Sequence, residues 1–335
     1  MKTKKDVQRI ILIFSLSLLC LLISAVLGIL FGSVKLGIRD IFASLFDSAN
    51  STEKTIIVSL RLPRVLGAFL AGAALAVSGL VLQCVTGNSL CAPNIVGVNS
   101  GAGFAVILML CFMPSAWSLL PLGAFFGALC ATLVITAISR FASKRSVTLV
   151  LAGVAVSSLL NSAISFLSLR FPDVMPSYTA FSVGGFSSTA YKDLILPSLI
   201  IAVCLVCFQF LAPKLNLLLL GDELAHSLGV NVGLIRTVSL ILASALCGAA
   251  VSFAGLLGFV GLIVPHIVRR IVGNDMRINL AVSTLLGATL VILSDLVGRT
   301  LFSPSELPAG IITALIGAPF FLYLLCRRRG SFDKA

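Results

Sequence analysis

Arg61 and Arg64 stand three residues apart in the sequence RLPR, directly before a long apolar segment. Pro63 suits the first turn of a helix, where its missing N–H group costs no hydrogen bond. On a helix that begins there, the two guanidinium groups share one face. Such a pair can hold a carboxylate of a docking protein through charge-assisted hydrogen bonds. The alternative is that both arginines anchor the end of a helix.

A third arginine, Arg299, follows another apolar segment and has Asp295 four residues before it. This spacing favours a local ion pair on one helix. Glu306 follows shortly afterwards, before Pro308. A local pair and a docking role are compatible, so Arg61, Arg64 and Arg299 are the predicted docking residues.

Residues 221–230, GDELAHSLGV, form a short polar interruption between two apolar segments. Acidic residues favour a helix start and Gly229 favours a helix end. The helix would expose an apolar face that fits a groove on a partner protein. The alternative is a helix that lies on the membrane surface. The predicted contact helix comprises Gly221, Asp222, Glu223, Leu224, Ala225, His226, Ser227, Leu228 and Gly229.

Several kinds of chemistry have no matching motif. Most of the nine cysteines lie inside apolar runs, and no Cys/His spacing of a metal site occurs, so we expect no metal site. The two histidines, His226 and His266, have no catalytic partner placed by the sequence, so an intramembrane enzyme is not supported. No GxxxxGK[ST] motif is present, so we expect no cofactor on this chain, and ATP with Mg²⁺ would bind a separate subunit.

The elements that position these residues are apolar. The chain is 59% hydrophobic and 11% charged, whereas soluble domains are about 25% charged. Apolar runs of about 20 residues recur, and in lipid such runs must be helices. We predict an all-α, polytopic membrane protein with ten spans in a single domain, residues 1–335. The spans are residues 10–32, 64–84, 94–113, 118–139, 147–169, 194–212, 235–254, 257–269, 279–298 and 308–326.

The basic residues predict the orientation of these spans. The net charge of +12 would suggest nucleic acid in a soluble protein, but here Lys and Arg lie in short loops, and no nucleic acid is expected. With both termini cytoplasmic, the inside segments hold twice as many Lys and Arg as the outside segments, as the positive-inside rule requires. The first apolar run is too long for a signal peptide and is interpreted as a span.

A pattern in the second span recurs in the seventh. Gly72-Ala73-Ala74 and then Gly79-Leu80 correspond to Gly248-Ala249-Ala250 and then Gly255-Leu256. The copies lie five spans apart, so they cross the membrane in opposite directions. We therefore predict a weak inverted repeat of spans two to five and seven to ten, an arrangement common in transporters.

Six segments occur in an order that resembles one family: RLPR, GAALAVSG, NSLCAPNIVGVNSGAG (88–103), GDELAHSLGV, GFVGLIVPHIVR (258–269) and ELPAGIITALIGAPFF (306–321). They resemble the permease subunits of type II ABC importers for iron-siderophores, haem and cobalamin. The resemblance covers nearly the whole chain. It implies a subunit with ten spans in the cell membrane of a bacterium.

The resemblance also implies partners and roles. The permease would pair with a second copy or a paralogue, two cytoplasmic ATPases and an extracytoplasmic binding protein. Arg61, Arg64 and Arg299 match arginines that meet glutamates of the binding protein. Residues 221–229 match the helix that couples to the ATPase. Ser146 and Val147 match the region of the cytoplasmic gate, where the residue types differ from the family pattern.

We therefore expect a permease that imports an iron-siderophore, haem or a cobalamin-like ligand and performs no covalent chemistry itself. The alternative is an ion-coupled secondary transporter. That class usually needs acids inside the membrane, and the only acid near the interior of a span is Asp295. The motifs do not distinguish among the chelates.

Overall fold

The computed structural model describes residues 4–32, 52–140 and 145–332, and every regular element in these ranges is helical, as predicted. Short 3₁₀ turns at Pro93–Val96, Trp117–Leu119 and Pro172–Val174 join some of the helices. A π-helical segment, Ile56–Arg61, runs directly into α4. The α-helices are α1 (Lys4–Leu30), α3 (Thr52–Thr55), α4 (Leu62–Thr86), α5 (Val98–Phe112), α6 (Leu120–Arg140), α7 (Arg145–Arg170), α8 (Met175–Val183), α9 (Tyr191–Leu218), α10 (Asp222–Ser227), α11 (Val232–Ala254), α12 (Val260–Val272), α13 (Met276–Leu301) and α14 (Ala309–Phe332).

Seven of the described helical segments are long and apolar enough to cross a membrane. They include α1, α4, α6, α7, α9, α11 and α13. The shorter helices α5, α12 and α14 correspond to the three remaining predicted spans. Each of the ten predicted segments therefore coincides with a helix, within about six residues at its ends.

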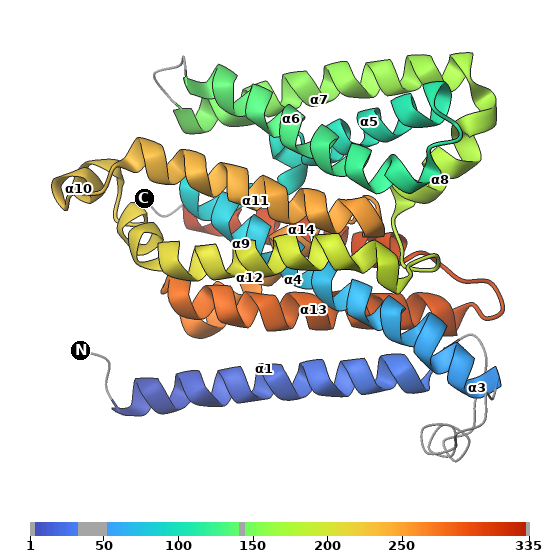
Figure 1. Cartoon of the computed structure of the whole chain (residues 1–335). Helices are drawn as coiled ribbons and strands as arrows, with labels where there is room; N and C mark the ends of the chain where they lie inside the picture. The colour runs from blue at the N-terminus through green and yellow to red at the C-terminus, as the bar shows by residue number, and fades with distance from the viewer. Residues whose placement is uncertain (1–3, 33–51, 141–144, 333–335) are drawn as a thin grey trace.

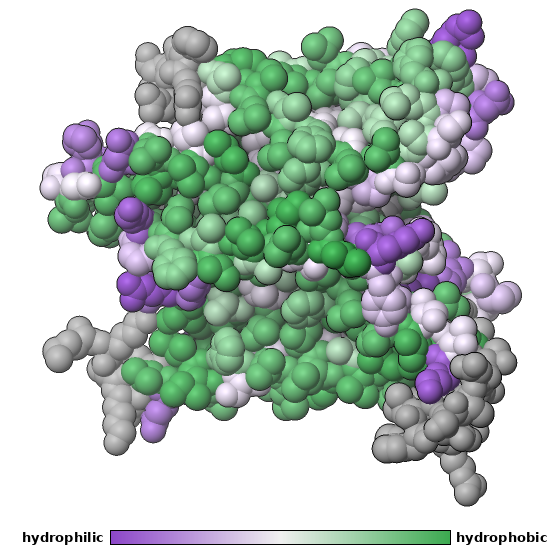
Figure 2. All heavy atoms as spheres, viewed as in Figure 1, coloured by the Kyte–Doolittle hydropathy of each residue, from purple (hydrophilic) through white to green (hydrophobic). Residues whose placement is uncertain are grey.

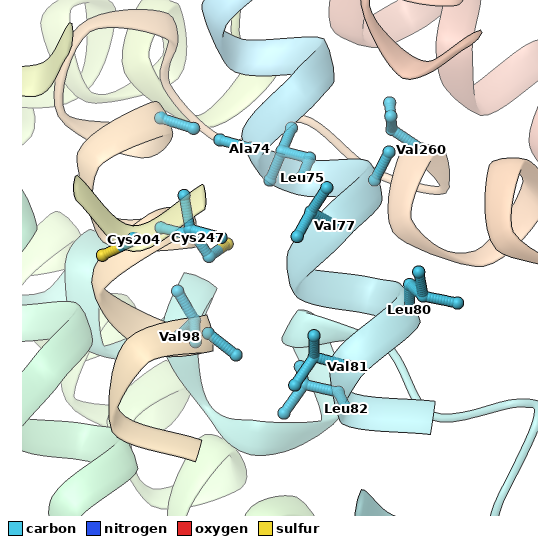
Figure 3. Close-up of a cluster of buried hydrophobic side chains, with 14 of the residues drawn as sticks. Ala74, Leu75, Val77, Leu80, Val81, Leu82, Val98, Cys204, Cys247 and Val260 are labelled. Atoms are coloured by element: carbon cyan, nitrogen blue, oxygen red, sulfur yellow. The ribbon is translucent and has the colours of Figure 1, made fainter. Parts of the chain in front are cut away.

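The helices run roughly side by side, and α4 lies at the centre of the bundle (Figure 1). Every residue of α4 from Ala71 to Thr86 is buried. Its small and aliphatic side chains pack against α9, α11, α12 and α13. Figure 3 shows part of this buried cluster, around Leu75, Val77 and Leu80. In contrast, α1 lies along one flank, and α5, α6 and α7 form the opposite side (Figure 1).

The bundle has two polar ends. One end, which we call the α10 end, carries α10 and the first turn of α1; the other, the α8 end, carries α3, α8 and the connection between α13 and α14 (Figure 1). A hydrophobic surface lies between hydrophilic patches at these two ends (Figure 2). Exposed apolar side chains are stable in lipid but not in water, so this band is the membrane-facing surface.

The structure contains the inverted repeat predicted from the sequence. The first repeat is α4 to α7 and the second is α11 to α14, and α4 and α11 run in opposite directions through the bundle (Figure 1). The repeats are interleaved: α4 packs most extensively on α13, the third helix of the other repeat, and α11 packs on α6, which is also the third helix of the other repeat. The two helices α4 and α11 also pack on each other at the centre.

Glycine allows the close approach at the first of these crossings. A Cβ atom on Gly72 would overlap the carbonyl group of Gly287 on α13. The matching residue of the second repeat, Gly248, lies against Phe125 and Ala128 of α6, where a Cβ atom would be 3.3 Å from both. Small residues at such crossings permit backbone contact between membrane helices.

Candidate functional site

A network of charged side chains lies at the α8 end, where α4, α13 and the connection from α13 to α14 meet. Arg64, in the first turn of α4, donates from Nε and Nη2 to the carboxylate of Asp295 on α13, over 2.9 to 3.0 Å. Its Nη1 donates to Glu306 Oε2 at 2.7 Å. The side chain of Asp295 is 2% exposed and that of Arg64 is 12% exposed. This buried, bidentate pair therefore fixes the start of α4 against the end of α13.

Arg299 lies one turn after Asp295, as its spacing predicts. Its Nε lies 3.6 Å from Asp295 Oδ2, which confirms the local ion pair. Its Nη2 donates to the carbonyl oxygen of Gly28 on α1. Arg299 thus joins the carboxylate on its own helix to the end of α1.

Arg61 also binds the end of α1. Its Nη1 donates to the carbonyl oxygens of Ile29 at 2.8 Å and Leu30 at 2.6 Å. Because α1 ends at Leu30 and Phe31 bonds to Leu27, the carbonyl groups of residues 28–30 are those left without a partner inside the helix. Two arginines satisfy these groups, and their positive charges also suit the negative end of the helix dipole.

The structure thus brings the three predicted docking arginines together at one end of the bundle. It also shows that each guanidinium group already has partners within the chain. Arg61 and Arg299 are 4% and 2% exposed. Arg64 and Glu306 border a cavity of about 310 Å³ whose other lining includes four serines, Ser177, Ser187, Ser188 and Ser252. Docking to another protein stays a prediction, and Arg64 is the arginine placed best for it.

The predicted contact helix forms at the α10 end as α10. Its first turn holds Asp222 and Glu223. Gly229, at φ 81°, ends it: the N–H group of Gly229 donates to His226, and that of Val230 donates to Ala225. These two bonds are the Schellman arrangement that glycine favours after a helix. The sequence therefore predicted both ends of this helix.

The apolar face of α10 points away from the bundle. Leu224 and Leu228 are 58% and 59% exposed, whereas Ala225 between them is fully buried against the rest of the chain. One ion pair fastens the helix: Arg236 Nη2 on α11 lies 2.9 Å from Asp222 Oδ1. The result is a short helix that projects beyond the bundle (Figure 1) and presents two leucines.

Asn216, near the end of α9, makes contacts that the sequence did not predict. Its Nδ2 donates to Asp275 Oδ1 at 3.2 Å, and its Oδ1 accepts from the backbone N–H of Met276 at 2.7 Å. Asp275 in turn accepts from the N–H of Arg277 and caps α13. This Asn216 contact ties α9, which leads into α10, to the start of α13. No sequence signal reveals it, because the residues lie about 60 positions apart.

A second missed feature is a polar stripe on α7. Ser158, Asn161, Ser162 and Ser165 are all exposed and lie near the middle of a membrane-spanning helix. Their spacing places them on one face. Polar groups in spans usually face a protein partner or a water-filled path rather than lipid. The i, i+3, i+4, i+7 spacing of these four residues is visible in the sequence and was sufficient to predict the stripe.

Ser146 and Val147, the residues matched to the cytoplasmic gate, lie in the first turn of α7. Their side chains are outside the part of the chain that the structure describes, as are residues 141–144 before them. Their role as a gate stays a prediction.

Comparison with known proteins places this arrangement in a family. The model of the FecCD transport family matches residues 20–327. The Fe(3+)-citrate import system permease protein YfmE of Bacillus subtilis is 36% identical over 97% of both chains. The hemin transport system permease protein HmuU of Yersinia pestis is 37% identical over 93% of this chain and 95% of its own.

Two solved structures of transporters are also similar to this chain. An inward-facing structure of a metal-chelate type ABC transporter superposes with a TM-score of 0.82 and 32% identity, over 94% of this chain and 99% of that one. PsaBC from Streptococcus pneumoniae shares the fold at a TM-score of 0.61 and 17% identity. The all-helical bundle, its interleaved repeats and these matches lead to one conclusion: the chain is a membrane permease that belongs to the FecCD transport family.

Proposed function

We propose that this permease is the membrane-spanning subunit of an ABC importer that carries a ferric chelate or haem into the cytoplasm. Its relatives are named for Fe(3+)-citrate and for hemin, and its structural neighbour is a metal-chelate type transporter. These names suggest the class of cargo, an iron bound by an organic ligand. A siderophore belongs to the same class.

The observation that carries the proposal is the exposed apolar face of α10. Two leucines more than half exposed, on a short helix beyond the membrane-facing surface, are unfavourable in water. They suit a groove on a partner protein, which here is a cytoplasmic ATPase that binds and hydrolyses ATP with Mg²⁺. The α10 end is then the cytoplasmic end, and both termini are cytoplasmic.

Movement of α10 can reach the bundle through two contacts. Asp222 binds Arg236 on α11, and Asn216 ties α9 to the start of α13. Both α11 and α13 pack on the central helix α4. Closure of two ATPases would therefore shift the helices that surround α4 and alternate access to the transport path.

The stripe on α7 supports pairing with a second permease, either an identical copy or a paralogue. Ser158, Asn161, Ser162 and Ser165 would be costly against lipid in the middle of a span. Two copies that face each other through α7 would enclose these hydroxyl and amide groups. The cargo path then runs between the two permeases.

At the α8 end, an extracytoplasmic binding protein would deliver the cargo. Its carboxylates would approach Arg64 beside the cavity that this arginine lines, and would compete with Glu306 for it. Contact with Arg61 and Arg299 requires that their bonds to α1 be exchanged for bonds to the binding protein. The bonds lost and the bonds gained are both charge-assisted hydrogen bonds of a guanidinium group, so one set can replace the other.

The ion-coupled alternative has less support. Its most suitable acid, Asp295, binds Arg64 in a bidentate pair and also lies beside Arg299. A carboxylate held by two guanidinium groups is poorly suited to bind and release a coupling ion. No observation in the described residues favours this function over the ABC importer.

The test begins with the complex. We expect the Leu224→Gln/Leu228→Gln double variant to lose co-purification with the ATPase. The groove on the ATPase would receive amide groups in place of apolar side chains. Leu301→Gln is the matched control, since Leu301 is 70% exposed but lies at the α8 end. Co-purification that survives in the double variant contradicts the assignment of α10.

Transport is measured next, with permease, ATPase and binding protein in proteoliposomes. Uptake of labelled ferric citrate and of haem is expected to require ATP, and the preferred cargo identifies the chelate. Uptake that continues without ATP and stops when the ion gradient is removed would establish the secondary transporter instead.

A further inference from the structure

A cavity of about 410 Å³ opens at the α10 end, between α1 and the turn that joins α12 to α13. It lies on the flank of the bundle, where α1 is the outermost helix (Figure 1). It is far from the charged network at the α8 end and takes no part in the proposed transport path. Its lining is formed by Arg9, Ile10, Ile13, Arg270, Ile271, Val272, Gly273, Asn274 and Asp275.

Two arginines from different helices supply the positive charge of this cavity. Arg9 lies in the second turn of α1, and Arg270 lies in the last turn of α12; both are exposed. Arg9 donates one bond, from Nη2 to the carbonyl oxygen of Ile271 at 3.3 Å. A guanidinium group has five N–H donors, so most of the donors of Arg9 remain available.

One carboxylate shares the cavity, and its charge is partly engaged elsewhere. Asp275 Oδ1 accepts from Asn216 Nδ2 and from the N–H of Arg277. The lining therefore carries two cations against one anion. The remaining wall includes the apolar side chains of Ile10 and Ile13. Positive and apolar groups lie together where the membrane meets water.

An anionic phospholipid has the complementary chemistry. Guanidinium groups bind phosphate oxygens in pairs, and they are less strongly hydrated than ammonium groups. Basic pockets between membrane helices at the membrane surface are suited to acidic headgroups. The isoleucines would contact the glycerol and the first carbons of the acyl chains. We propose that this cavity binds the headgroup of an anionic phospholipid, with the phosphate held between Arg9 and Arg270.

The bound lipid would also fasten α1. This helix is poorly buried along most of its length, and Arg9 joins it to α12 through a hydrogen bond to the carbonyl oxygen of Ile271. A phosphate that bridges Arg9 and Arg270 adds a second link between the same two helices. Retention of the lipid and attachment of α1 at the α10 end are therefore coupled.

The test counts bound lipids on the full-length permease by native mass spectrometry, in neutral detergent with phosphatidylglycerol or phosphatidylcholine added. We expect one tightly bound phosphatidylglycerol that phosphatidylcholine does not replace. The Arg9→Gln/Arg270→Gln double variant should bind it about 30-fold more weakly, since each basic residue near the surface contributes about a fivefold effect. Arg277→Gln is the matched control, because Arg277 is exposed at the same end but does not line the cavity.

Three results would overturn the proposal: equal losses in Arg277→Gln and the double variant, equal binding of the two lipids, or displacement of the lipid by inorganic phosphate at low millimolar concentration. The Arg9→Lys/Arg270→Lys variant should keep part of the preference because its charge is retained.

If the Arg9→Gln/Arg270→Gln variant does not fold, a salt titration of the unmodified chain tests the proposal. Its preference for phosphatidylglycerol must weaken as salt rises to about 0.5 M. A preference independent of salt contradicts the proposal. The measurement needs no ATPase or cargo, so its failure leaves the proposed transport function untouched.

Discussion

Asp295 is a buried carboxylate that holds side chains from two helices far apart in the sequence. Arg64 of α4 binds both of its oxygens, and Arg299 of its own helix lies beside Oδ2. Through these arginines, the one carboxylate connects the start of α4, the end of α13 and the end of α1. Its removal would leave two guanidinium groups buried without their shared counter-charge.

We therefore expect Asp295→Asn to lower the free energy of unfolding by about 3 kcal/mol, as removal of one partner from a buried ion pair commonly does. Denaturant titration in neutral detergent measures the change. Glu306→Gln is the control, because Glu306 is 28% exposed and its pair with Arg64 should contribute only about 1 kcal/mol or less. Equal losses in the two variants would show that Asp295 is not the centre of the network.

At this scale the sequence predicted local contacts and missed distant ones. The pair of Asp295 and Arg299 follows from four-residue spacing on one helix. The pair of Arg64 and Asp295 joins residues 231 positions apart, so it depends on how α4 and α13 cross. The bonds from Arg61 to the end of α1 likewise depend on where α1 lies in the bundle. The sequence of α1 gives no sign that an arginine will bind its last carbonyl groups.

The helices themselves were predicted well wherever their limits are set by local chemistry. Gly229 ends α10, and the acidic pair Asp222 and Glu223 begins it. The start of α12 was also predicted imperfectly: the predicted span begins at 257, whereas the helix begins at Val260. Phe259 precedes it with φ at 65°, a conformation rare for an aromatic residue. Phe259 lies directly against Gly317 of α14, and a single sequence does not reveal this distant contact.

Asn216 provides a prediction at the scale of elements. We expect Asn216→Ala to loosen the attachment of α9 to α13 and to leave the exposed face of α10 intact. ATPase co-purification should persist, while cargo transported per ATP hydrolysed should fall several-fold. Uptake and phosphate release in the same proteoliposomes give this ratio.

Ser198→Ala is the matched control for that measurement. Ser198 lies on the same helix, is partly exposed, and donates its hydrogen bond to the carbonyl of Ile195 within its own turn. An unchanged ratio in Asn216→Ala would mean that force from α10 reaches the bundle by another route, such as the pair of Asp222 and Arg236.

The interleaving of the two repeats determines the shape of the whole molecule. Neither repeat covers its own first helix, because α4 packs on α13 and α11 packs on α6. The repeated glycine pattern in the sequence indicated the inverted relation, but not which helices cross. That choice depends on the complete set of packing faces, most of which are uniformly apolar in sequence.

Gly72→Ala tests the central crossing. The added methyl group would overlap the backbone of Gly287, so α4 and α13 must separate. We expect a loss of about 2–3 kcal/mol, the upper part of the range for an overpacked core. Thermal unfolding in detergent measures it, with Gly258→Ala as the control, since nothing lies within 4 Å of a Cβ atom there. A smaller loss in Gly72→Ala than in Gly258→Ala would contradict the close crossing.

The same crossing has a consequence for biogenesis. While the ribosome is still translating the second half, α4 enters the bilayer without its main partner, and its small residues face lipid. The surface around Gly72 is completed only after Gly287 has been synthesised. Truncated chains that stop before α13 should therefore expose this surface to membrane proteases, and pulse-chase labelling of such chains should reveal their rapid turnover.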